Sequence, residues 1–98
     1  MGISVREGGG VYHLSGELDW EGGEDLRIGM RPARTGSREL VLDLSYVRFI
    51  NSMGVWALAL LAKKRWGVLV LHYPQEALMR VFELLQLDEM AGIRIELE

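Results

Sequence analysis

The chain has 98 residues and 26% of them are charged, while 49% are hydrophobic, so we expect one globular domain over residues 1–98 rather than a disordered chain. The formal net charge is −3, and the 11 basic residues form no continuous stripe, which argues against nucleic-acid binding. The chain contains no cysteine, which excludes disulfides, thiolate chemistry and cysteine-based zinc sites.

Two short β-prone runs open the chain. They cover residues 3–7 and 11–16 and are separated by three glycines, which supply the positive φ angles of a tight turn. This pattern predicts a β-hairpin. The next segment, residues 19–34, predicts a short helix, which its three glycines and one proline would distort.

Two nearly continuous apolar runs, residues 39–44 and 67–73, predict interior strands covered on both faces or close to it. Between them Val55, Leu58 and Ala62 fall on one helical face. Ser52 is suited to cap this helix, and the basic residues 63–65 suit its end. Strand, helix and strand in this order predict a right-handed crossover between parallel strands.

The C-terminal part predicts one more helix and one more strand. Residues 75–86 keep helical spacing after Pro74, and residues 93–98 read as a charged edge strand. The predicted order is therefore β-β-α-β-α-β-α-β. We expect an α/β fold, in which an N-terminal hairpin and parallel β-α-β crossovers form a mixed sheet packed with helices.

Catalytic and ligand-binding patterns are weak. Ser52, His13 or His72, and Asp43 supply the residue types of a hydrolase, but no G-x-S-x-G turn occurs. Both histidines lie in predicted strands, where hydrogen-bonded structural imidazoles are common. Metal-ligand spacing and a phosphate-binding loop are also missing. We therefore expect no enzyme, no cofactor and no metal site.

The sequence also lacks targeting and membrane signals. The first residues have no apolar run of the kind a signal peptide needs, and no apolar run is long enough to span a bilayer. We expect a soluble, cytoplasmic protein without direct membrane insertion.

Ser52 permits two interpretations. At the start of a helix its hydroxyl can cap the free N–H groups, and the same N–H groups and the helix dipole would also accept a phosphate there. A second open question concerns the helix that follows. Trp56 and Leu60 lie away from the stripe of Val55 and Leu58, so they form either a partner surface or a contact with a neighbouring helix.

Three segments together resemble the STAS domain family, the fold of bacterial anti-sigma factor antagonists. LVLDLSYVRFINSMGVWALALLAKK resembles the central signature, in which an apolar strand leads through a polar turn into a helix. LSGELDWE resembles the earlier strand end and HYPQEALMRVFELLQL the later strand and helix. Asn51 stands where the family usually has Asp, and Met53 replaces a small Ser or Thr.

The resemblance implies an anti-sigma factor antagonist. Ser52 matches the serine that an anti-sigma factor with serine-kinase activity phosphorylates. Phosphorylation breaks the complex between antagonist and anti-sigma factor, and a phosphatase restores it. This switch regulates sigma-factor-dependent transcription. Asp19 matches an acidic residue near that serine. The residues expected to contact the partner are Asp19, Asn51, Ser52, Met53, Gly54, Val55 and Trp56.

The same family implies an alternative function. Short cytoplasmic STAS proteins also accompany the ATPase of bacterial ABC-type lipid-transport complexes, and there the Ser52 and Trp56 face would bind the ATPase without phosphorylation. Ser52 favours the phosphorylation switch. Met53 and the short chain favour the transport subunit.

Overall fold

The computed structural model describes residues 2–30, 39–64 and 67–97, which form one five-stranded sheet with helices packed on it. The described elements are β1 (Ile3–Gly8), β2 (Val11–Leu18), α1 (Trp20–Gly29), β3 (Leu40–Ile50), α2 (Ser52–Lys63), β4 (Leu69–His72), α3 (Glu76–Leu84), a 3-10 turn (Leu87–Glu89) and β5 (Ile93–Glu96). The predicted α/β class and the predicted order of strands and helices are confirmed.

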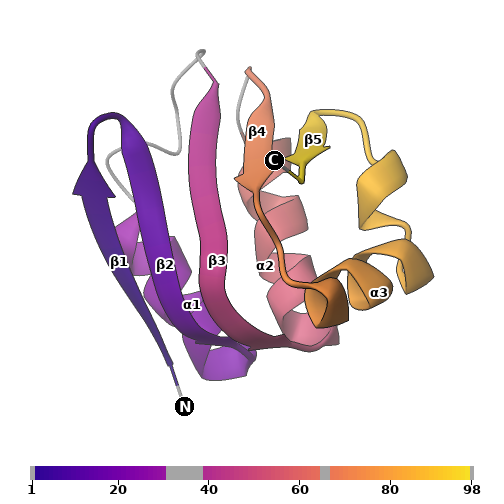
Figure 1. Ribbon diagram of the computed structural model, residues 1–98, viewed down its shortest axis with the longest axis horizontal. Helices are drawn as coiled ribbons and strands as arrows, with labels where there is room; N and C mark the ends of the chain where they lie inside the picture. The colour runs from indigo at the N-terminus through magenta and orange to yellow at the C-terminus, as the bar shows by residue number, and fades with distance from the viewer. Residues whose placement is uncertain (1, 31–38, 65–66, 98) are drawn as a thin grey trace.

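The sheet has the strand order β1-β2-β3-β4-β5 (Figure 1). Strands β1 and β2 pair antiparallel, whereas the three other neighbouring pairs are parallel. The hairpin turn uses Gly9 and Gly10 at φ angles of 62° and 82°, which glycine adopts without strain. The predicted hairpin and the parallel pairing of the strands on either side of α2 are both confirmed.

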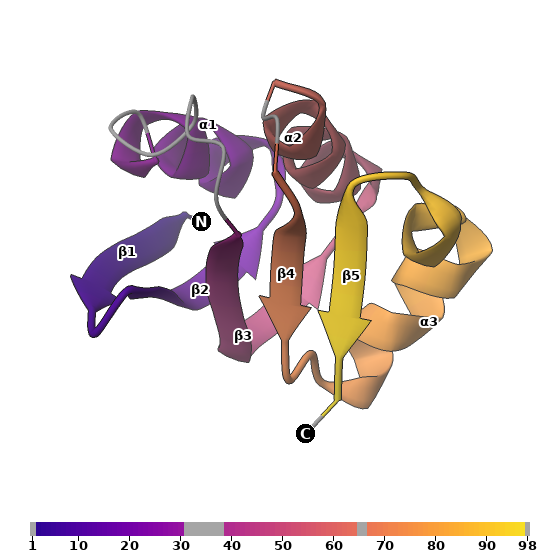
Figure 2. The same cartoon turned by 90° about the horizontal axis from the view of Figure 1, so that it is seen from above.

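Helices α1 and α2 cover one face of the sheet, and α3 lies beside its β5 end (Figure 2). The core forms between the sheet and these helices, and Leu14, Leu42, Leu58 and Phe82 are among its fully buried side chains. The opposite face of β1, β2 and β3 is turned away from α1 and α2 (Figures 1 and 2). The two faces of the sheet therefore have different environments.

Strand β3 is longer than the predicted run of residues 39–44. It continues to Ile50 because register shifts against β2, between His13 and Ser15 and between Gly16 and Glu17, accommodate extra residues. Its first half alternates between buried leucines and half-buried residues, so β3 comes close to the expected coverage on both faces without reaching it. The expectation holds better for β4, where Leu69–Leu71 are all buried.

The helices differ from their predicted bounds only at the ends. Helix α1 ends at Gly29, and residues 31–34 of the predicted helix lie outside the described residues, as does Arg65 of the predicted basic end of α2. Helix α3 is shorter at both ends than residues 75–86, and β5 ends at Glu96.

Candidate functional site

The C-terminal ends of β2 and β3 meet at one end of the sheet and lead directly into α1 and α2. Leu18 pairs with Ile50, and the Asn51 N–H donates a hydrogen bond of 3.3 Å to the Leu18 carbonyl. Asp19 follows Leu18 in the chain, so it lies at the same end of the sheet as the start of α2. The parallel register thus brings together Leu18 and Ile50, which are 32 residues apart in sequence.

Both helices begin with the same arrangement. Asp19 Oδ1 accepts a hydrogen bond of 2.8 Å from the Gly22 N–H, and Asn51 Oδ1 accepts bonds of 3.0 and 3.1 Å from the Met53 and Gly54 N–H groups. The expectation that Ser52 caps α2 is therefore wrong. Asn51 is the cap because its amide oxygen reaches two of the free N–H groups, and Ser52 becomes the first helical residue.

Glycine is required three residues after each cap. A Cβ atom at Gly22 would overlap the Glu17 carbonyl oxygen, and one at Gly54 would overlap the Leu18 carbonyl oxygen. The first turns of α1 and α2 consequently rest on consecutive carbonyl groups of β2. This contact fixes where Ser52 stands relative to Asp19.

Ser52 is exposed at the start of α2. The first turn of α2 contains no acidic residue, so its positive dipole end is not offset by a carboxylate within that turn. An anion on the Ser52 hydroxyl would therefore be favoured by the positive end of the helix dipole. Phosphorylation of Ser52 stays a prediction.

A groove runs between α1 and α2, with a volume of about 210 Å³. Much of its lining is apolar, and its two large side chains, Trp20 and Trp56, remain 63% and 60% exposed. Leu60 also lines the groove and is half-buried, whereas Trp56 is exposed, and a partner surface on this face stays a prediction. Other lining residues are Gly23, Met53 and Ala57.

Charged side chains stand along the polar part of the groove lining. Glu24 and Arg27 form an ion pair at 3.2 Å one turn apart on α1. Lys64, at the C-terminal end of α2, also lines the groove. The groove is therefore largely apolar, with acidic and basic side chains in its lining.

The predicted contact residues divide into surface and core positions. Ser52, Met53 and Trp56 are exposed, and Asp19 and Asn51 are half-buried. Gly54 and Val55 are buried, so they act on a partner only through the position of α2.

Trp20 was not predicted from the sequence. It follows the cap Asp19 as Ser52 follows the cap Asn51. The shared spacing of cap and glycine in DWEG and NSMG could have indicated it.

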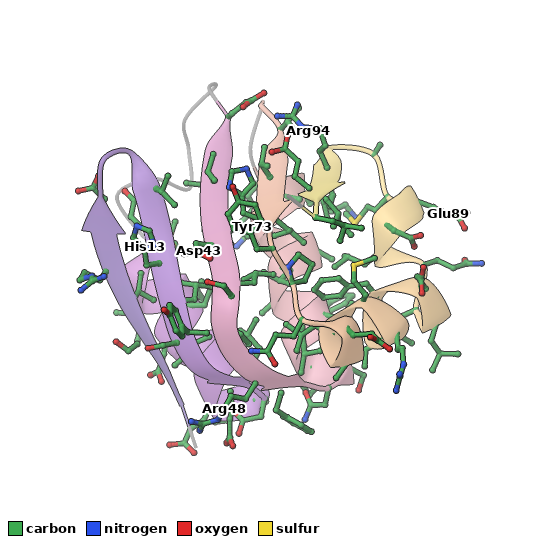
Figure 3. The ribbon with its side chains drawn as sticks, viewed as in Figure 1. His13, Asp43, Arg48, Tyr73, Glu89 and Arg94 are labelled. Carbon is green, nitrogen blue, oxygen red and sulfur yellow. The ribbon has the colours of Figure 1, made fainter. Side chains whose placement is uncertain are left out.

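The face of the sheet away from α1 and α2 carries a row of polar residues. Cross-strand register aligns one residue from each strand in the order Arg6, His13, Asp43, His72 and Glu96. His13 Nδ1 lies 2.8 Å from Asp43 Oδ2, and His72 Nε2 lies 2.6 Å from Glu96 Oε1. Figure 3 shows His13 and Asp43 side by side on this face.

The two carboxylates of the row have lowered pKa values. Partial burial raises the pKa of Asp43, but hydrogen bonds from the Ser45 hydroxyl and N–H and the contact with His13 outweigh it. Hydrogen bonds from Arg94 and His72 lower the pKa of Glu96. Since an ionised Asp43 only accepts, His13 donates through Nδ1, and both histidines have the structural role expected from the sequence.

This row does not assemble the hydrolase that the residue types allowed. A serine nucleophile needs the histidine between it and the acid, whereas here Asp43 stands between Ser45 and His13. Asp43 and Ile50 are seven residues apart on β3, about 23 Å along an extended strand, and Ser52 lies beyond Ile50. The histidines are therefore explained by their carboxylate partners within the sheet.

The described residues hold neither a cluster of metal ligands nor a membrane-spanning helix. Within residues 2–30, 39–64 and 67–97, no three side chains of the metal-ligating types gather to form a cation site. In the same ranges, the helices are too short or too polar to cross a bilayer.

The chain is similar to a known protein family over nearly its whole length. A family model described as "Mlab, STAS domain" matches residues 1–95. No curated protein matches the chain. Domains of the matched type generally mediate protein–protein interactions and are generally not enzymes.

Proposed function

Because a model of the family matches residues 1–95, the chain belongs to the STAS domain family, and on that premise we propose that it is a binding module for an ATP-binding protein. The partner docks on the end of the molecule formed by the α1–α2 groove and Ser52. The observation that supports this most directly is the pair of exposed tryptophans, Trp20 and Trp56, beside the groove. Large aromatic side chains dominate the binding energy of many protein interfaces.

The groove suits the insertion of one or two apolar side chains of the partner. A volume of about 210 Å³ is too small to contain a whole helix. A specific interface buries about 800 Å² on each partner, so the contact extends beyond the groove. The exposed residues around Ser52 and Asn51 supply the adjoining area.

Our first candidate is an anti-sigma factor antagonist in the bacterial cytoplasm. The partner is an anti-sigma factor with serine-kinase activity, which binds ATP and supplies the base, while this chain supplies the Ser52 hydroxyl. The phosphate would bring about −1.5 to −2 charges next to Met53 and Trp56. Covering it with an apolar partner surface would require its desolvation, so the complex would dissociate until a phosphatase removed the phosphate.

The test is incubation with the cognate serine-kinase anti-sigma factor and with ATP, followed by peptide mass spectrometry. We expect one phosphate, on Ser52, and none on Ser52→Ala. The alanine variant should still bind the partner, because Asn51 rather than Ser52 caps α2. Phosphate on another residue, or undiminished labelling of Ser52→Ala, would exclude the switch.

The second candidate is a subunit of a bacterial ABC-type lipid-transport complex that binds the ATPase without phosphorylation. The apolar lining supports it, since Met53, Trp20 and Trp56 form a docking surface that needs no phosphate. Co-expression with a neighbouring transport ATPase should then give a stable complex that resists phosphatase treatment. Failure to form this complex, together with Ser52 labelling by a kinase, would decide for the first candidate.

Substitution of Trp56 tests the docking surface under both candidates. We expect Trp56→Ala to weaken partner binding roughly thirtyfold or more, the effect of a binding hot spot, with a change in unfolding free energy within about 0.5 kcal/mol. Leu84→Ala is the matched control, because Leu84 is 79% exposed on α3 and lies outside the groove. A large loss of stability in Trp56→Ala, or equal binding losses in both variants, would contradict the surface.

A further inference from the structure

Met53 differs from the other methionines that the structure describes. Met30 is fully buried, and Met79 and Met90 are partly buried against the core. Met53 is 42% exposed at the second position of α2, directly after Ser52. Among Met30, Met53, Met79 and Met90, its thioether is therefore the most open to a small oxidant in solution.

The surroundings of Met53 make its polarity important. Its side chain lines the groove together with Trp20, Trp56 and Ala57. Oxidation of the thioether would replace a flexible apolar group by a polar, chiral sulfoxide in this lining. In the free protein the new oxygen would be hydrated, because the residue is partly exposed. Under a bound partner it would be a buried acceptor without an assured donor.

We propose that Met53 is a redox modification site, at which a peroxide oxidises the thioether to the sulfoxide and thereby weakens docking on the α1–α2 groove. The Met53 sulfur attacks one oxygen of hydrogen peroxide, the O–O bond breaks and an S–O bond forms. Sulfur loses two electrons, and the peroxide is reduced to water. The docking consequence rests on the proposed function, whereas the preferential oxidation does not.

The chemistry also leaves the fold intact. The backbone N–H of Met53 donates to Asn51 Oδ1, so the side chain has no part in the cap. Oxidation of buried Met30 would instead introduce a polar group into the core. Modification at Met53 is therefore expected without unfolding, and the thermal transition of the protein should change little.

The first test treats the folded protein with hydrogen peroxide and follows each methionine by peptide mass spectrometry. We expect Met53 to oxidise roughly tenfold faster than Met30 and clearly faster than Met79 and Met90, because reaction follows exposure. The oxidised protein should show NMR shifts at the indole N–H groups of Trp20 and Trp56. Equal oxidation rates, or indole signals that do not move, would overturn the proposal.

The second test measures binding of the partner found under the proposed function, the cognate kinase or the transport ATPase, before and after peroxide treatment. We expect oxidation to weaken binding about tenfold in the wild type and to leave Met53→Leu unchanged, since leucine keeps the volume without the oxidisable sulfur. Methionine sulfoxide reductase should restore wild-type binding. Unchanged binding of the oxidised wild type would overturn the proposed effect of Met53 oxidation and would leave the proposed docking function standing. Selective oxidation with no binding partner would instead refute the proposed docking function and, with it, the regulatory consequence.

Discussion

At the scale of single residues, two neighbouring side chains at the start of α2 have different roles. Asn51 caps the helix, and Ser52 does not. Asn51 Oδ1 accepts hydrogen bonds from the Met53 and Gly54 N–H groups, whereas the neighbouring residue Ser52 is exposed. A hydroxyl that caps a helix would lose its bond when it was modified. Here modification of Ser52 would leave the cap in place, which suits a reversible chemical change.

The first prediction compares the two neighbours. Asn51→Ala should lower the free energy of unfolding by about 1 kcal/mol, because two N–H groups lose their acceptor. Ser52→Ala should change it by less than about 0.5 kcal/mol, as expected for an exposed position. Urea unfolding monitored by circular dichroism measures both. Equal destabilisation by the two substitutions would mean that Ser52 contributes to the cap.

The predicted start of α2 lies within one residue of the observed start, but the predicted cap is wrong. Asn and Ser are both favourable caps and stand next to each other, so residue preference cannot distinguish them. The choice depends on where the backbone leaves β3, and this is set by the pairing of Ile50 with Leu18 on another strand. A tertiary contact decided a local feature.

At the scale of elements, α1 and α2 are positioned by the end of β2. Gly22 packs on the Glu17 carbonyl and Gly54 on the Leu18 carbonyl. In the sequence these glycines only lower helix propensity, and Gly22 was one of the three glycines that, with one proline, predicted a distorted helix over residues 19–34. Their purpose is close backbone approach, and α1 is a regular helix from Trp20 to Gly29.

The second prediction tests this seating. Gly54→Ala should destabilise the protein by about 3 kcal/mol, because its Cβ would overlap a backbone carbonyl and also crowd Ile50. Gly8→Ala is the matched control, since the nearest atom to its Cβ is the His13 ring at 3.9 Å. That variant should stay within about 0.5 kcal/mol of the wild type. Thermal unfolding measures the stability of both variants. Equal stability of Gly54→Ala and Gly8→Ala would refute the close contact of Gly54 with the β2 carbonyl.

At the scale of the whole molecule, one row of polar side chains crosses all five strands on the face opposite α1 and α2. The sequence indicated that His13 and His72 would be structural. It could not supply their partners, because Asp43 and Glu96 are 30 and 24 residues away in the chain. Those pairs follow from strand order and register, which apolar periodicity leaves open.

The third prediction concerns acid stability. Asp43 and Glu96 have pKa values below their ordinary values of 3.8 and 4.5. A lowered pKa in the folded state stabilises the fold above the unfolded-state pKa, and this contribution is lost as the pH falls through the folded-state value. We therefore expect the free energy of unfolding to decline below about pH 5 as these carboxylates are protonated.

The variant Asp43→Asn isolates the contribution of one carboxylate. It should be less stable than the wild type at pH 7 by about 1–2 kcal/mol and should lose less stability between pH 5 and pH 3. Asp88→Asn, in the exposed 3-10 turn outside the row, should keep the wild-type profile. Parallel pH profiles for the wild type and Asp43→Asn would show that the row does not couple protonation to folding.

The seating of two helices on consecutive carbonyls of one strand also has a kinetic consequence. The walls of the groove share one support at their N-terminal ends, so they cannot separate there without breaking contacts of β2 with both helices. A partner therefore binds a preformed surface, and binding restricts few main-chain degrees of freedom of this protein. Association should proceed at the roughly 10⁵–10⁷ M⁻¹ s⁻¹ of pre-organised protein pairs. Differences among groove variants should then appear chiefly as differences in the lifetime of the complex.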